Sequence, residues 1–132
     1  MPPEEFFPFD ILLVQRDEVA AYIETTRLKN LGCKVKHVKA AFDAIGVLKE
    51  RNQRFDFIFL DIFLYDMAGS ELIETIRPLI PEKTKLVILT SFVDQKDYEY
   101  LSKHEIKNIF ERPVPTEDFK LFFQTHLLQS II

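Results

Sequence analysis

Three side chains that could take part in phosphoryl chemistry each come at or just after the end of a short apolar run. They are Asp61, Thr90 and Arg112, after the runs 57–60, 86–89 and 106–110. A carboxylate in such a place can attack a phosphoryl group, and a hydroxyl and a cation beside it can bind the oxygens of that group. Each residue also has an ordinary interpretation: a strand-ending aspartate, a threonine bonded to local backbone, and a surface arginine before a proline.

Five apolar runs, at 11–14, 33–38, 57–60, 86–89 and 106–110, are the elements that must position these side chains. Three of them are continuous rather than alternating, which is typical of strands buried on both faces of a parallel sheet. Lys34 and Lys36 interleave with the second run, as expected of an edge strand protected by charge. The fifth run is short and flanked by charges, which suits the opposite edge.

The stretches between the runs read as helices. One covers 18–31 and ends at Gly32, apolar stripes mark others at 41–48 and 72–76, and a more polar helix covers 94–104. Thr116 is expected to cap a last helix, whose first turn then holds Glu117 and Asp118.

Strands and helices therefore alternate five times, which predicts a flavodoxin-like α/β fold. We expect a (βα)5 three-layer sandwich whose five-stranded parallel sheet has the order 2-1-3-4-5. Sites in such sheets lie at the carboxyl ends of the central strands. That edge would gather Gln15, Arg16, Asp61, Thr90 and Arg112.

Length and composition limit the class of protein. The 132 residues suit one domain, taken here as 9–132, after an irregular, proline-containing lead-in at 1–8. The 17 Lys and Arg residues against 21 Asp and Glu give a net charge of −4, which argues against a nucleic-acid partner. No apolar stretch approaches the ~18 residues of a membrane span, and no signal peptide is visible, so we expect a cytoplasmic location and no membrane partner.

The segment 61–69, DIFLYDMAG, resembles the phosphoacceptor segment of response-regulator receiver domains. The run ending in Thr90-Ser91 and the pair Arg112-Pro113 are similar to two further family motifs, and the resemblance spans about 9–131. It implies that Asp61 is the aspartate phosphorylated by a partner histidine kinase. It also implies that the Phe63 carbonyl binds Mg²⁺, that Thr90 is the switch hydroxyl, and that Gly69 permits the turn into the third helix.

Several positions depart from the family pattern. Receivers carry two acidic residues just after the first strand to hold Mg²⁺, whereas this chain has Gln15 and Arg16. Arg112 stands in place of the family's lysine, and Tyr65 in place of a loop proline. Ile109 occupies the aromatic switch position, and the neighbouring Phe110 is expected to face the other side of the sheet.

These departures predict a degenerate receiver in phosphorelay (two-component) signalling, one that is not an enzyme and is weakly phosphorylated or not phosphorylated. No cofactor is expected, because Mg²⁺ should bind poorly without the acidic pair. Arg16 could instead form an ion pair with Asp61 or point to solvent. The alternative is a conventional receiver phosphorylated on Asp61, with Mg²⁺ held by a site rebuilt from Asp17, Glu18 or Asp66.

The last predicted helix suggests a contact surface. Phe119, Phe122, Phe123 and Leu127 form one apolar stripe, and a second stripe contains Leu121, Leu128 and Ile132. The second stripe suits a broadly packed helix equally well. The expected partners are a histidine kinase or phosphotransfer protein, a downstream protein, or a second copy bound through the fourth helix, fifth strand and fifth helix.

Overall fold

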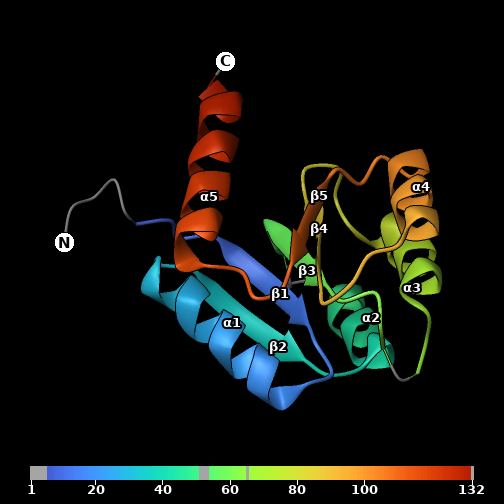
Figure 1. The fold of residues 1–132 in the computed structure, drawn as a ribbon. Coiled ribbons are helices and arrows are strands. Elements are labelled where there is room, and N and C mark those ends of the chain that lie inside the picture. Colours follow the sequence, from blue (N-terminus) through green and yellow to red (C-terminus); the bar gives the residue numbers. More distant parts are fainter. Residues whose placement is uncertain (1–5, 51–53, 65, 132) are drawn as a thin grey trace.

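The computed structural model describes residues 6–50, 54–64 and 66–131 (Figure 1). Tyr65, Ile132 and the first five residues of the lead-in lie outside these ranges. Five strands form one parallel sheet in the order β2-β1-β3-β4-β5, as predicted. The strands are β1 (Asp10–Val14), β2 (Lys34–Val38), β3 (Phe57–Leu60), β4 (Lys85–Thr90) and β5 (Asn108–Glu111).

Helices alternate with these strands and cover both faces of the sheet, which confirms the flavodoxin-like three-layer sandwich. In the described ranges they are α1 (Glu18–Asn30), α2 (Ala41–Lys49), α3 (Gly69–Ile76), α4 (Gln95–Lys103) and α5 (Thr116–Ile131), with a 3₁₀ turn, η2 (Arg77–Leu79), after α3. Helices α1 and α5 lie on one face, and α2, α3 and α4 on the other (Figure 1).

The central strands are buried and the edge strands are not. Every residue of β3 is buried, as are nearly all of β1 and β4, whereas β2 and β5 are partly exposed throughout. This is the burial expected when helices cover both faces of a parallel sheet. The predictions of buried central strands and of a partly exposed, lysine-containing edge strand are therefore confirmed.

The ends of two helices differ from the predictions. Helix α1 ends at Asn30, and Gly32 follows in the left-handed region with a φ of 98°. Helix α5 begins at Thr116 itself, so the prediction that Thr116 caps it was wrong. The preceding Pro115 takes the place outside the helix, and its carbonyl accepts the Asp118 N–H at 3.0 Å.

An aromatic cluster fills the space between β3 and α5. The Phe57 ring lies 5.5 Å from the ring of Phe123 and 5.1 Å from that of Phe9. Phe7 is also buried, and its N–H donates to the Leu31 carbonyl at 2.7 Å. The irregular segment before β1 thus contributes side chains to the core on the α1 and α5 face.

No helix in the described ranges combines the length and apolar character that a bilayer span requires.

Replacing the fully buried Phe57 with alanine should lower the free energy of unfolding by about 3–5 kcal/mol, because it leaves a cavity in this cluster. Phe42, 64% exposed at the start of α2, provides the matched control, and F42A should change stability by no more than about 0.5 kcal/mol. Urea unfolding measures both, and equal losses in the two variants would contradict the assigned core.

Candidate functional site

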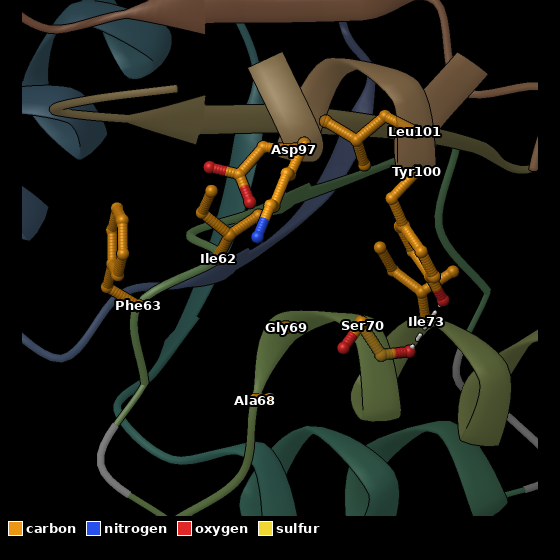
Figure 2. A pocket seen from close by; sticks show the side chains of 10 residues that line it. Ile62, Phe63, Ala68, Gly69, Ser70, Ile73, Asp97, Tyr100 and Leu101 are labelled. Carbon is orange, nitrogen blue, oxygen red and sulfur yellow. Dashed lines mark hydrogen bonds between the residues drawn. The ribbon is translucent and has the colours of Figure 1, made fainter. Parts of the chain in front are cut away.

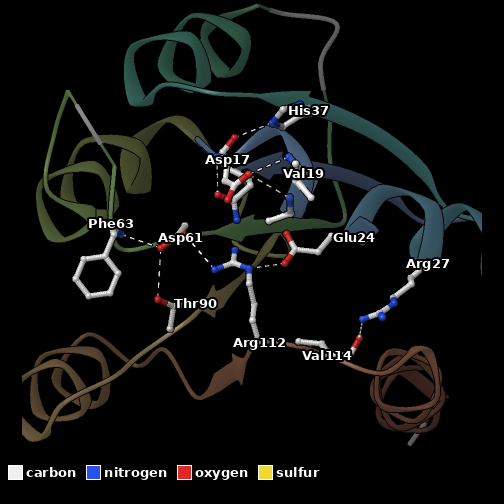
Figure 3. Close-up of polar contacts among 12 residues, drawn as sticks. Asp17, Val19, Glu24, Arg27, His37, Asp61, Phe63, Thr90, Arg112 and Val114 are labelled. Atoms are coloured by element: carbon white, nitrogen blue, oxygen red, sulfur yellow. Dashed lines mark hydrogen bonds and ion pairs between the residues drawn. The ribbon is translucent and has the colours of Figure 1, made fainter. Parts of the chain in front are cut away.

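Asp61 lies at the carboxyl end of β3 and is 6% exposed. Its Oδ1 accepts the Phe63 N–H at 2.8 Å, and its Oδ2 accepts Arg112 Nη1 at 3.0 Å (Figure 3). Both oxygens of the carboxylate are therefore bound within the protein.

Thr90 is fully buried at the end of β4, the strand beside β3. Its hydroxyl lies 3.4 Å from Asp61 Oδ1 and 3.4 Å from the Phe92 carbonyl. A hydroxyl has one proton and donates it to one acceptor at a time. The Thr90 hydroxyl can therefore bond either Asp61 or the Phe92 carbonyl. These are the two roles that the sequence leaves open for it.

Arg112 follows β5 and joins two carboxylates from different elements. Its backbone N–H donates to the Thr90 carbonyl at 2.8 Å, which places the residue beside β4. Its Nη1 donates to Asp61 and its Nε to Glu24 of α1 (Figure 3). One largely buried cation therefore lies between two buried anions.

The ion pair hypothesised for Arg16 is formed in the structure by Arg112. Gln15 is 1% exposed and Arg16 is exposed, as expected for neighbours in an extended segment, whose side chains point in opposite directions. At the end of β1, Gln15 therefore lies inside the protein, whereas Arg16 is exposed.

Glu24 is the site residue that sequence reasoning missed. It is 4% exposed and lies on the same face of α1 as the buried Ala21 and Leu28, three residues before it and four after it. That helical spacing is the signal that could have identified it. Burial raises the pKa of the Glu24 carboxyl above its ordinary value, and the hydrogen bond and charge of Arg112 offset the rise only in part.

Residues 11–123 match a family model described as the response regulator receiver domain. The chain belongs to the response-regulator receiver family. Receiver domains act in two-component signalling, where they interact with histidine kinases or phosphotransfer proteins.

Two curated relatives of this receiver are fungal proteins named transcription factor SKN7. The one from Chaetomium thermophilum is 25% identical over 117 residues, which cover 89% of this chain and 15% of that protein. The one from Candida albicans is 24% identical over 120 residues, which cover 91% of this chain and 21% of that protein. This receiver therefore spans about a fifth or less of the length of each.

Solved structures show the same fold at low identity. A two-component response regulator from Clostridium difficile has a TM-score of 0.81 at 20% identity, covering 92% of this chain and 98% of the other. The receiver domain of the Pseudomonas aeruginosa sensor histidine kinase PA1611, solved with a magnesium ion in its active-site cleft, has a TM-score of 0.76 at 23% identity. That match covers 90% of this chain and 97% of the other.

Gln15 occupies the first position at which the receiver pattern has an acid. Its Oε1 accepts the Asp17 N–H at 2.9 Å, and its backbone carbonyl accepts a hydrogen bond from His37 Nε2 at 2.7 Å. The only side-chain oxygen at this position is neutral and already bound to the backbone.

The three acids considered for a rebuilt metal site are all bound elsewhere. Asp17 caps α1 by accepting the Val19 N–H at 2.9 Å. Glu18 pairs with Lys39. Asp66 accepts the N–H groups of the first residues of α2. Within the described ranges, no three His, Cys, Asp or Glu side chains are grouped so that they could hold a metal ion.

The two neighbouring residues of β5 face opposite sides of the sheet, as predicted. Ile109 packs against the cluster under α2, α3 and α4, and Phe110 packs against Phe119 and Phe122 of α5. Ile109, at the aromatic switch position, therefore lies on the face opposite Phe110.

A hollow of about 360 Å³ lies beside the loop that follows Asp61, between α3 and α4 (Figure 2). Tyr100 of α4 lines it, and its hydroxyl donates to the Ser70 carbonyl at 3.1 Å. A Cβ on Gly69 would come within 2.6 Å of the Ile62 Cα. Gly69 therefore allows a close approach between the loop and the start of α3.

Asp66 ties the loop after β3 to the start of α2. Its two carboxylate oxygens accept the N–H groups of Ala41 and Phe42, each at 3.0 Å, while Ala40 offers no side-chain cap. Burial on its own would raise the pKa of Asp66, but the backbone donors of Phe42 and Ala41 hold that pKa below its ordinary value of 3.8.

Replacing Asp66 with alanine should lower the free energy of unfolding at pH 7 by about 1 kcal/mol, because α2 loses its cap. The folded-state pKa lies below the unfolded one, so this stabilisation is fully present above the unfolded value of 3.8 and is lost as the pH falls through the folded value. The difference between the wild-type protein and D66A should therefore shrink as the pH falls below about 4.

Urea unfolding at a series of pH values measures this difference. Asp43 is an exposed acid in the first turn of α2 that accepts none of the capping N–H groups, so D43A serves as the control and should cost less stability than D66A. A D66A protein as stable as the wild type at pH 7 would show that the loop does not cap α2.

Proposed function

We propose that this receiver works in phosphorelay signal transduction as a protein-interaction module with a degenerate Mg²⁺ site and weak or absent phosphorylation at Asp61. On this proposal it needs no cofactor, catalyses no reaction of its own and acts in the cytoplasm. Its partners are a histidine kinase or phosphotransfer protein, a downstream protein, or both.

One observation carries the proposal: Arg112 binds the Asp61 Oδ2 and is itself held by Glu24. A divalent cation bound to Asp61 would lie next to a guanidinium in a buried setting, where like charges repel strongly. Mg²⁺ also requires an octahedron of hard oxygen ligands. Gln15 supplies a neutral oxygen already bound to Asp17, so we infer that these donors do not fit Mg²⁺.

Phosphoryl transfer to a carboxylate depends on neutralising the charge that develops on the phosphoryl oxygens. The roles that the resemblance gives to Thr90 and to the Phe63 carbonyl stay predictions. Thr90 lies close enough to Asp61 to contact a group held there, which supports its assignment. Slow transfer is expected because the metal, rather than the hydroxyl, supplies most of that neutralisation.

Exposed apolar side chains lie on α5, next to β5. Leu121 and Leu128 are 62% and 59% exposed, and a shallow hollow lies among Phe110, Leu121 and Phe122. We propose this surface for a downstream protein or a second copy of the chain, because exposed apolar side chains gathered on one face favour association.

Incubation with a small phosphodonor and millimolar Mg²⁺, followed by intact-mass measurement, tests the proposal. The wild-type protein should gain little or no phosphoryl adduct, because Gln15 and Arg16 supply no acidic ligand for Mg²⁺. The double variant Gln15→Asp/Arg16→Asp, which restores the receiver pattern after β1, should gain an Mg²⁺-dependent adduct.

Asp61→Asn in both backgrounds is the matched control and should abolish any adduct on the acceptor. A stoichiometric adduct on the wild-type protein that Asp61→Asn removes would overturn the proposal and establish the conventional phosphoacceptor instead.

A further inference from the structure

Helix α1 is tied at two points to the segment that follows β5. Glu24 accepts from Arg112 Nε, and Arg27 donates to the Val114 carbonyl (Figure 3). These two residues are three positions apart, so they lie on one face of the helix. The position of Arg112 therefore depends on α1 as well as on β5.

The geometry of the guanidinium links its two partners. Nε binds Glu24, and Nη1 binds Asp61. The group is rigid and planar, so fixing the direction of the Nε–H also fixes the direction of the Nη1–H bonds. A carboxylate at Glu24 thus determines where the donor that contacts Asp61 points.

Packing does not explain a carboxylate at this position of α1. Its neighbours on the same face, Ala21 and Leu28, are buried apolar residues. The Glu24 Oε1 is buried and makes no hydrogen bond of ordinary geometry among the described residues. Burial raises the pKa of this carboxyl, and the nearby side chains of Arg112 and Gln15 offset the rise only in part. A buried carboxylate that is only partly satisfied lowers stability relative to an apolar side chain.

We propose that Glu24 is a positioning residue that holds Arg112 across Asp61 and so keeps the acceptor carboxylate closed to anionic groups. One cation already serves two carboxylates, so an anion arriving at Asp61 would add a third negative group. The closure of Asp61 to anionic groups rests on the proposed function, whereas the positioning of Arg112 by Glu24 does not. Two measurements separate them.

The first measurement follows solvent exchange of the Arg112 Nε–H by NMR, with the resonance assigned by its loss in Arg112→Lys. Glu24→Gln keeps the size of the side chain and removes its charge. It should speed exchange about tenfold or more, the loss expected for one charge-assisted hydrogen bond. Asp61→Asn should leave the exchange rate nearly unchanged, because Glu24 still holds Nε.

Glu18→Gln is the matched control, since Glu18 is an exposed acid on the same helix whose partner is Lys39. It should not alter exchange at Arg112. An unchanged rate in folded Glu24→Gln, or an equal acceleration in Asp61→Asn, would overturn the positioning role.

The second measurement uses beryllofluoride, a phosphoryl mimic, with Mg²⁺ and ¹⁹F NMR. Glu24→Gln should bind it at least about tenfold more tightly than the wild-type protein, because removing a nearby buried negative charge favours an anion. Arg112→Lys, which keeps a cation but lacks the Nε–H that Glu24 binds, should show a gain in the same direction and remains informative if Glu24→Gln does not fold. Binding should vanish when Asp61→Asn is added.

If folded Glu24→Gln bound beryllofluoride no more tightly than the wild-type protein, the idea that Glu24 closes the acceptor would be overturned. If Glu24→Gln does not fold, an unchanged affinity in Arg112→Lys would overturn it. Tight binding by the wild-type protein itself would overturn the proposed function. The exchange measurement would still report whether Glu24 positions Arg112.

Discussion

A single guanidinium shared by two buried carboxylates is the interaction on which this site depends. Asp61 and Glu24 are almost fully buried, and burying a carboxylate is costly unless a cation or hydrogen-bond donors pair with it. The sheet order supplies that contact, because β4 and β5 pair with Thr90 opposite Glu111 and so bring Arg112 to the end of β3. Helix α1 supplies the second anion. Residues at β3, β5 and α1, which are distant in the sequence, thus meet at the Arg112 guanidinium.

This arrangement explains why the family fold and phosphorylation depend on different residues. The fold, and the family match over residues 11–123, depend on the apolar strands and the helices that cover them. Phosphorylation depends on a small number of charges at one edge of the sheet. On our account this receiver keeps the first set of features and has changed the second, with a neutral Gln15 facing inward and an internal cation at Asp61.

Much of the fold can be predicted because its signals are local. The continuous runs at β1, β3 and β4 and the lysines of β2 report burial directly, and the alternation of elements then limits the sheet order. The contacts of the site are not local. Arg112 and Glu24 are 88 residues apart, and Asp66 caps a helix 25 residues earlier in the chain. The pairing of Arg112 with Asp61 depends on where β3 and β5 end relative to each other, which composition and motif spacing do not specify.

The most direct test of the account is a titration of the wild-type receiver with Mg²⁺, followed by NMR at the backbone amides of Asp61 and Phe63. The account predicts small shifts that do not saturate in the millimolar range, because Gln15 and Arg16 supply no acidic ligand and Arg112 places a positive charge beside Asp61. Saturable shifts at both amides at or below millimolar Mg²⁺, accompanied by release of Arg112 from Asp61, would contradict it.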